Sequence, residues 1–255
     1  MNLSGNTMLI TGGGSGIGRG LAEAFHALGN QVIIAGRRSG LLDEVTEANP
    51  GMKSLTVDMG DAKAIAEFAA RAVAQFPALN VLINNAGIMR SERLGKPQAD
   101  LEDAEAIVAT NLLGPIRLTA ALVSHLQKQA SAAIINVSSG LAFVPLVFTP
   151  TYCATKAAIH SYSQSLRYQL KSTSVEVIEL APPYVQTNLM AGADDPRAMP
   201  LKEFIAEVME IFKTQPTPGE ILVERVKQLR NAEREGRYDG TFAGLNGGMA
   251  ALFEE

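Results

Sequence analysis

The chain contains a single cysteine, Cys153, and no apolar run long enough to cross a membrane. One cysteine excludes an intramolecular disulfide and favours the reducing cytoplasm as the location. The longest apolar stretch, Leu141–Phe148, is short and is interrupted by Pro145, so we expect no membrane partner. The formal net charge of −4 also argues against nucleic acid or an anionic membrane as a partner.

Histidine is scarce as well. His26, His125 and His160 occur within helical patterns at unrelated positions, and their spacing is not that of metal ligands. We therefore expect no metal site and give each histidine a structural role. Cys153 has no visible acid–base partner in the sequence, and a small packing residue is the better interpretation.

The chain does have a regular alternation of strand-like and helical patterns. Its 255 residues and 47% hydrophobic content suffice for one large domain, residues 1–255. Alternation of apolar, β-branched runs with helical segments predicts an α/β fold, a parallel sheet covered by helices on both faces. The predicted strands are 7–11, 31–35, 53–57, 80–84, 132–138 and 174–181, and the predicted helices are 16–28, 39–48, 61–75, 101–128 and 151–171.

A glycine-rich turn follows the first predicted strand. Gly12, Gly16 and Gly18 have the spacing Gly-x-x-x-Gly-x-Gly and lead directly into a helical pattern. Such glycines let the backbone approach a pyrophosphate closely, and the helix N-terminus then offers free N–H groups. A glycine-rich turn alone could be only a loop, but its place between strand and helix favours a dinucleotide site.

Tyr152 and Lys156 are four residues apart, and Ser139 lies thirteen positions upstream of the tyrosine. On a helix, positions i and i+4 share one face, so a phenol and an ammonium would project side by side. The cation would stabilise the phenolate and lower the tyrosine pKa toward the working range. Taken alone, the same spacing is that of any amphipathic helix face.

These motifs occur together and in order, and the chain resembles the short-chain dehydrogenases/reductases of about 250 residues, over residues 5 to 190. This resemblance implies a Rossmann-type doubly wound sheet of three layers. It also implies that Tyr152 is the catalytic acid–base, that Ser139 bonds the substrate oxygen, and that Lys156 tunes Tyr152 and binds the nicotinamide ribose. Asn111 would hold a water that links Lys156 to solvent. Ser138 would instead bond the backbone locally.

The same resemblance implies a set of cofactor-binding residues in addition to Tyr152 and Lys156. They lie after successive predicted strands and comprise Gly12, Gly14, Ser15, Gly16, Ile17, Gly18, Arg37, Arg38, Asp58, Met59, Asn85, Ala86, Gly87, Pro182, Val185 and Thr187.

Two arginines follow the second predicted strand, where NAD-preferring relatives usually have an acidic residue. Guanidinium groups at Arg37 and Arg38 favour a 2′-phosphate through charge-assisted bonds, so we predict NADP(H) rather than NAD(H). The alternative is a solvated basic turn.

Two departures from the family pattern concern the substrate side. Pro183 stands where a glycine is usual, and proline forbids positive φ. Residues 236–255 show no strand alternation where relatives have a final strand. Both features resemble the DltE-like subgroup, whose substrates do not follow from sequence. The segment 188–218 is typical of a substrate lid. The predicted pocket wall is apolar and comprises Leu141, Phe143, Val144, Leu146, Phe148, Tyr184, Leu189 and Met190.

Together, these features predict an NADP(H)-dependent oxidoreductase that transfers hydride to or from a small, hydrophobic carbonyl or alcohol substrate. The alternative is a regulatory protein that binds the cofactor with little or no turnover. The apolar residues of the helices at 101–128 and 151–171 exceed what one sheet face needs, and family members pair through these helices. We therefore expect a homodimer.

Overall fold

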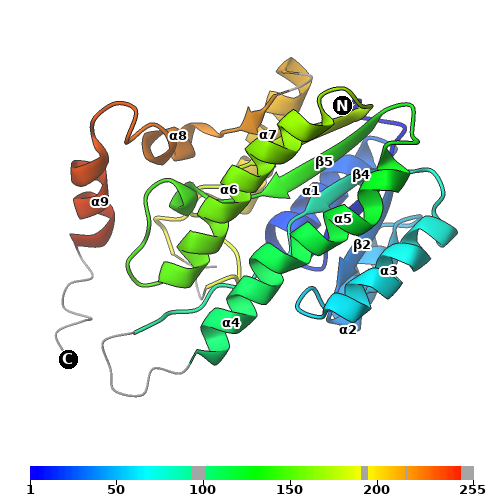
Figure 1. Ribbon diagram of the computed structural model, residues 1–255, viewed down its shortest axis with the longest axis horizontal. Helices are drawn as coiled ribbons and strands as arrows, with labels where there is room; N and C mark the ends of the chain where they lie inside the picture. The colour runs from blue at the N-terminus through cyan, green and yellow to red at the C-terminus, as the bar shows by residue number, and fades with distance from the viewer. Residues whose placement is uncertain (94–100, 191–194, 216–217, 248–255) are drawn as a thin grey trace.

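The computed structural model describes residues 1–93, 101–190, 195–215 and 218–247. A seven-stranded parallel sheet with the order β3-β2-β1-β4-β5-β6-β7 forms the centre of the molecule (Figure 1). The strands are β1 (Thr7–Thr11), β2 (Gln31–Gly36), β3 (Lys53–Thr56), β4 (Leu79–Asn84), β5 (Ala132–Val137), β6 (Val175–Leu180) and β7 (Glu220–Ile221). The predicted doubly wound α/β fold is confirmed.

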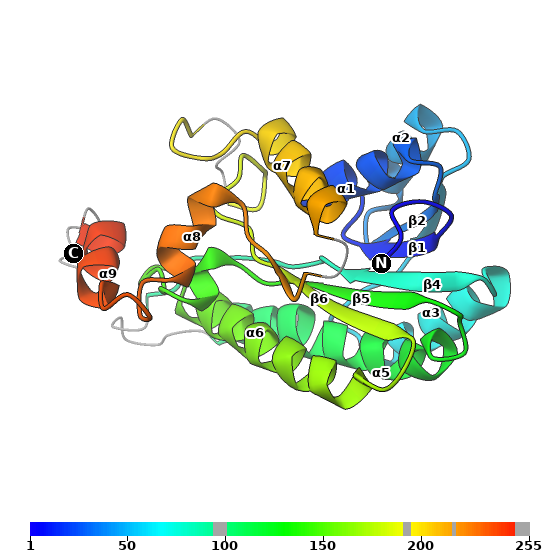
Figure 2. The same cartoon turned by 90° about the horizontal axis from the view of Figure 1, so that it is seen from above.

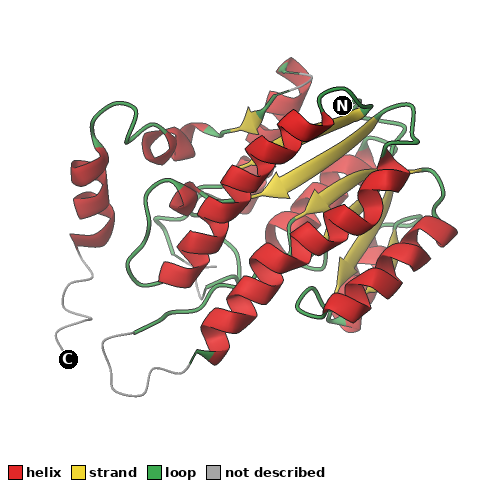
Figure 3. Ribbon diagram, in the orientation of Figure 1, coloured by secondary structure: helices red, strands yellow, loops and turns green. Residues whose placement is uncertain are grey.

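The helices cover both faces of the sheet (Figures 2 and 3). One face carries α1 (Gly16–Ala27), α2 (Ser39–Ala48) and α7 (Leu201–Thr214), and the other carries α3 (Ala62–Gln75), α4 (Glu102–Val108), α5 (Gly114–Leu126) and α6 (Pro150–Leu170). Two short helical turns, η1 (Ala109–Leu113) and η2 (Gly140–Ala142), and the C-terminal helices α8 (Glu224–Arg230) and α9 (Tyr238–Asn246) complete the described elements.

Alternation along each strand divides the apolar side chains between two cores. In β1, Met8 and Ile10 face the α1 side, while Leu9 faces the α3 and α5 side. Because both faces are buried, the strands have continuous apolar runs. Parallel strands also place their carboxyl ends at one edge of the sheet, where loops from distant parts of the sequence meet.

The predicted helix 101–128 is one continuous helical run, α4–η1–α5, with a π-helical turn at Ala109–Leu113. Residues Glu102–Leu126 are long and apolar enough to cross a membrane by length and composition. The core helix of a soluble α/β protein passes the same test, and Leu118, Leu122 and Leu126 are fully buried in the core shared with the sheet.

The C-terminal part differs from the prediction. A seventh strand is present, but it consists only of Glu220 and Ile221 and pairs in parallel with β6. Two residues are too few to give a detectable alternation, which is why the sequence indicated six strands. The tail that the sequence left without a strand contains α9, whereas residues 248–255 lie outside the described part of the chain.

The predicted lid, residues 188–218, contains α7. This helix buries Phe204, Val208 and Phe212 in the core, and the Phe212 ring lies edge-on to Phe25 of α1 with centroids 5.7 Å apart. Residues 191–194 and 216–217 of the predicted lid lie outside the described residues. The lid role stays a prediction.

Candidate active site

The carboxyl ends of β1 and β4 are joined by one threonine hydroxyl. Thr11 Oγ1 accepts hydrogen bonds from the backbone N–H groups of Asn85 and Ala86, both at 3.0 Å. Asn85 Nδ2 in turn donates to the Thr11 carbonyl oxygen at 2.9 Å. The Asn85 side chain therefore braces the loop after β4 against the glycine-rich turn.

The glycine-rich turn forms a surface from which side chains are excluded. Gly12 and Gly16 have φ values of +69° and +54°, a region that residues with a Cβ rarely adopt. A Cβ on Gly18 would lie 2.3 Å from the Gly12 carbonyl oxygen and 2.4 Å from Asn85 Nδ2. The bare backbone at the start of α1 fits a pyrophosphate, because it combines close approach with free helical N–H groups.

Two arginines lie beside this turn at the end of β2. Arg37 Nη1 is 3.9 Å from Asp58 Oδ2, and both side chains are about half exposed, at 57% and 48%. Arg38 Nη2 is 3.5 Å from Ser15 Oγ of the glycine-rich turn. Both guanidinium groups are thus weakly engaged. Met59, another predicted cofactor residue, has its side chain in the core, so only its backbone could contact the cofactor.

The structure brings Ser139, Tyr152 and Lys156 together as the sequence predicts. Ser139 immediately precedes η2, and its hydroxyl lies close enough to Tyr152, the third residue of α6, to lower the pKa of that phenol. Lys156 follows one turn later, with Nζ 5.5 Å from the Tyr152 ring centroid. Its ammonium donates to the Val137 carbonyl oxygen at 2.8 Å. All three side chains are buried.

Burial has the largest effect on the pKa values of Tyr152 and Lys156. It raises the pKa of Tyr152 well above its usual value, and the Ser139 hydroxyl offsets part of that rise. The expected lowering of this pKa by Lys156 is not found, because desolvation of the phenolate has the largest effect and Ser139 is the group that opposes it. Burial also lowers the pKa of Lys156 to about 8, against the opposing effect of the Glu179 carboxylate.

A carboxylate that the sequence did not single out anchors the N-terminus of α6. Glu92 accepts from the Thr151 backbone N–H at 2.9 Å and from the Thr151 hydroxyl at 2.6 Å. The helix has no side-chain cap of its own from Thr149. An anion here satisfies free N–H groups and matches the helix dipole, so Glu92 fixes the turn that carries Tyr152.

Asn111 lies in the π-helical turn, a feature often found at functional sites. Its amide bonds the Ile88 backbone at both ends, with Nδ2 donating to the carbonyl and Oδ1 accepting from the N–H, each at 2.8 Å. One N–H and one lone pair of the amide are thus used in the loop after β4, and the predicted role of Asn111 in holding a water stays a prediction.

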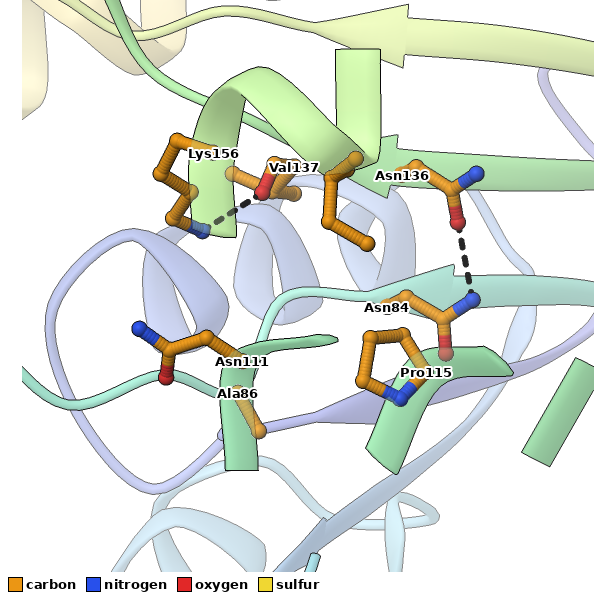
Figure 4. Close-up of a pocket in the computed structure, with 8 residues that line it drawn as sticks. Asn84, Ala86, Asn111, Pro115, Asn136, Val137 and Lys156 are labelled. Atoms are coloured by element: carbon orange, nitrogen blue, oxygen red, sulfur yellow. Dashed lines mark hydrogen bonds between the residues drawn. The ribbon is translucent and has the colours of Figure 1, made fainter. Parts of the chain in front are cut away.

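A closed cavity lies between Lys156 and the central strands (Figure 4). Its volume of about 10 Å³ is about the size of one water molecule, and Lys156, Asn111, Asn84 and Asn136 supply its polar lining. Asn84 Nδ2 donates to Asn136 Oδ1 at 2.9 Å, whereas the buried Asn84 Oδ1 has no hydrogen-bond partner in the described part of the chain. A water that this acceptor binds would stand next to Lys156, so Asn84 is better suited than the Asn111 side chain to hold it.

Only some of the residues predicted to form the pocket wall lie beside Tyr152. Leu141 and Leu146 pack around Tyr152 together with Ile88 and Met89. Val144 is fully buried, and the Phe143 ring instead contacts His160 and Arg230. Cys153 packs in the same cluster as Tyr152, and its pKa is raised by burial, in agreement with a packing role.

The loop after β6, which contains Pro183, is held in place by backbone hydrogen bonds. Val185 forms a parallel bridge with Met199, and Met199 N–H donates to the Tyr184 carbonyl oxygen at 2.8 Å. The Pro182 carbonyl oxygen accepts from Gly140 N–H at 2.8 Å and so holds the loop next to Ser139. Thr187 reaches the glycine-rich turn, where its Cγ2 would lie 3.3 Å from a Cβ on Gly16.

One prediction about Ser138 was wrong. Its hydroxyl bonds the buried Glu179 carboxylate at 2.5 Å, while the Leu180 backbone oxygen is more distant at 3.5 Å. The sequence feature that marks Glu179 is a charged residue within the apolar run of a strand that is buried on both faces.

Comparison with known proteins agrees with this geometry. The short chain dehydrogenase family model matches residues 6–198. An oxidoreductase of Bacillus subtilis, DltE, described as uncharacterized, is 41% identical over 249 residues, which cover 96% of this chain and 98% of the relative. The predicted resemblance to the DltE-like subgroup is thus confirmed over nearly the whole chain.

Solved structures show the same fold. A short chain dehydrogenase of Burkholderia cenocepacia in complex with NADP has a TM-score of 0.80 and 26% identity, over 96% of this chain and 99% of that one. A short chain dehydrogenase/reductase of Burkholderia phymatum in complex with NAD has a TM-score of 0.80 at 19% identity, over 94% and 96% of the two chains. The chain belongs to the short-chain dehydrogenase family and is an NAD(P)-dependent oxidoreductase.

Proposed function

We propose that this oxidoreductase prefers NADP(H) and interconverts a carbonyl compound and an alcohol on a small, hydrophobic substrate. The observation that carries the proposal is the burial of Ser139, Tyr152 and Lys156 side by side, at the sheet edge that also carries the glycine-rich turn. The turn Gly12–Gly18, Arg37, Arg38 and the loop after β4 would hold the cofactor.

When bound, the nicotinamide would supply or accept the hydride. Tyr152 keeps its proton in the resting protein, because burial raises its pKa, and can donate it to a carbonyl oxygen. Ser139, buried beside Tyr152, is placed to donate to the same oxygen. Lys156 favours the phenolate that remains, and a water bound by Asn84 in the adjoining cavity would return a proton toward Lys156.

Leu141 and Leu146 beside Tyr152 support a hydrophobic substrate. The test is NADPH oxidation measured with a panel of aldehydes, ketones and quinones, with polar sugar carbonyls as the contrasting set. We expect turnover with apolar carbonyls. Tight NADPH binding without turnover of any panel member would favour the regulatory alternative, which the presence of Ser139, Tyr152, Lys156 and Asn111 argues against.

The NADP(H) preference rests on Arg37 and Arg38. Removal of either guanidinium should weaken NADPH binding by about 1–3 kcal/mol and leave NADH binding nearly unchanged, because only the 2′-phosphate accepts its charge-assisted bonds. Arg37→Ala and Arg38→Ala are each titrated with both cofactors. Arg71→Ala, at an exposed guanidinium that bonds the Thr56 carbonyl oxygen, serves as the control. Equal losses for NADPH and NADH at both positions would refute the phosphate role.

We also propose a homodimer through α4–η1–α5 and α6. A groove of about 420 Å³ on this face is lined by Leu101, Val108, Leu113 and Thr151 among others, and Leu101 is 55% exposed. Leu113→Lys should shift the protein from dimer to monomer in light scattering at micromolar concentration. Leu28→Lys is the matched control, since Leu28 is 38% and Leu113 37% exposed. A monomeric or tetrameric wild type would contradict the proposal.

A further inference from the structure

A fully buried carboxylate lies beneath the loop that carries Ser139. Glu179 belongs to β6, has no exposed surface, and accepts hydrogen bonds from the Ser138 hydroxyl at 2.5 Å and from His160 Nδ1 at 2.7 Å. A buried carboxylate is costly unless its oxygens are fully bonded. Each oxygen here has one partner, so any change in the position of Ser138 or His160 would be unfavourable.

The two partners of Glu179 belong to the two segments that form the catalytic site. Ser138 directly precedes Ser139, and His160 lies one helical turn after Lys156 on α6. The position of Ser139 relative to Tyr152 depends on how the β5 end and α6 are placed with respect to each other. Glu179 bonds both segments from the neighbouring strand.

A second layer of contacts extends this arrangement to the C-terminal segment. Glu220 of β7 lies 4.0 Å from His160 Nδ1 and receives two hydrogen bonds of 2.9 Å from the Arg230 guanidinium. Arg230 lies over the Phe143 ring, 4.8 Å from its centroid, and the edge of His160 contacts the same ring. Helix α8 therefore packs against the loop after Ser139.

The ligand atoms of His160, Glu179 and Glu220 lie within 4.8 Å of one another, as those of a metal site would. Arg230 already supplies a positive charge to Glu220, and Glu179 is bonded by two donors. These interactions describe an ion-pair network that needs no added cation.

We propose that Glu179 is a positioning residue, which holds the Ser139 loop and the Tyr152–Lys156 turn at their catalytic separation through Ser138 and His160. This rests on the proposed roles of Ser139 and Tyr152. Ser138 is the contact on the loop side, and His160 is the contact on the helix side.

The charge of Glu179 has a second effect on the same site. It opposes the lowering of the Lys156 pKa, which burial brings to about 8. Among the described residues, the titratable groups against Lys156 are Tyr152 on its own helix and Glu179 on β6. Loss of the negative charge should thus lower the Lys156 pKa further, whereas loss of the Ser138 hydroxyl should not.

The test separates position from charge with Ser138→Ala and Glu179→Gln. Ser138→Ala removes one contact and keeps the charge. Its kcat on a carbonyl substrate from the panel should fall about 10- to 100-fold, because small displacements of catalytic groups have effects of this size. The NADPH dissociation constant should stay within about twofold, since the cofactor turn is untouched. Glu179→Gln keeps an acceptor for Ser138, so it should lose less activity than Glu179→Ala but move the alkaline limb of kcat/KM to lower pH.

The matched control is Asn30→Ala. Asn30 is also buried, and its replacement removes hydrogen bonds with Asn6 and with backbone carbonyl oxygens. It directly precedes β2, at the opposite edge of the sheet from the catalytic residues. It should lower the melting temperature with kcat unchanged. A kcat loss in Ser138→Ala no larger than in Asn30→Ala at equal destabilisation would overturn the positioning role.

A readout without turnover distinguishes this proposal from the proposed function. Amide hydrogen exchange over residues 140–143 should accelerate in Ser138→Ala and remain at the wild-type rate in Asn30→Ala. The Gly140 amide donates to the Pro182 carbonyl oxygen and the Leu141 amide donates to the Ser139 hydroxyl, so both bonds depend on the position of this loop. Unchanged exchange in Ser138→Ala would contradict the positioning role even in an active enzyme. Absence of turnover with every carbonyl would contradict the proposed function and leave this measurement interpretable.

Discussion

Replacement of Tyr152 by phenylalanine should lower kcat by roughly two to four orders of magnitude while NADPH affinity stays close to that of the wild type. The substitution removes one buried hydroxyl and keeps the ring that packs with Ile107 and Cys153. The proton that the substrate oxygen must receive is then missing, but the cofactor turn around Gly12–Gly18 is unaltered. Steady-state kinetics with a substrate from the panel and a fluorescence titration with NADPH measure the two quantities.

Tyr168→Phe is the matched control for this experiment. Tyr168 lies on the same helix, α6, but its side chain is 71% exposed and it is near the opposite end of the helix from Tyr152. It should keep wild-type kcat. Substantial activity in Tyr152→Phe would show that another group carries the proton, and a loss of NADPH binding would show that the hydroxyl serves mainly the cofactor.

The second large effect is expected at Gly18. An alanine here would place its Cβ 2.3 Å from the Gly12 carbonyl oxygen, which is a backbone atom and cannot rotate away. The turn must shift, at a cost of about 1–3 kcal/mol for overpacking of this kind. Because the same turn would bind the pyrophosphate, NADPH and NADH affinities should both fall, about 10- to 100-fold if the whole cost appears in binding.

Gly240→Ala serves as the control, because a Cβ at Gly240 of α9 meets no atom within 4 Å and the residue is helical. Its cofactor affinities should equal those of the wild type. Thermal melts without cofactor show how much of the Gly18→Ala cost is already present in the free protein. Unchanged affinity for both cofactors would mean that the turn does not contact them.

The sequence predicted the fold and the side chains that meet at the candidate site because both depend on local patterns. Apolar runs such as Met8–Thr11 form strands by composition, and Tyr152 and Lys156 face the same side of one helix by periodicity. Ser139, thirteen residues upstream, follows a strand end, which in a parallel sheet lies at the shared edge. These inferences needed no knowledge of which segments pack together.

The tertiary structure decided the features that join distant segments. Glu92 bonds Thr151, Glu179 bonds Ser138 and His160, and Arg230 bonds Glu220, and no spacing along the chain relates these pairs. The direction of the Tyr152 pKa shift was also a tertiary property, because desolvation depends on everything packed around the phenol. Local sequence determined where strands and helices form and which of them carry reactive groups. Only packing determined which buried charged groups contact one another beneath these reactive groups, because a buried carboxylate is stable only when distant segments supply its hydrogen-bond donors.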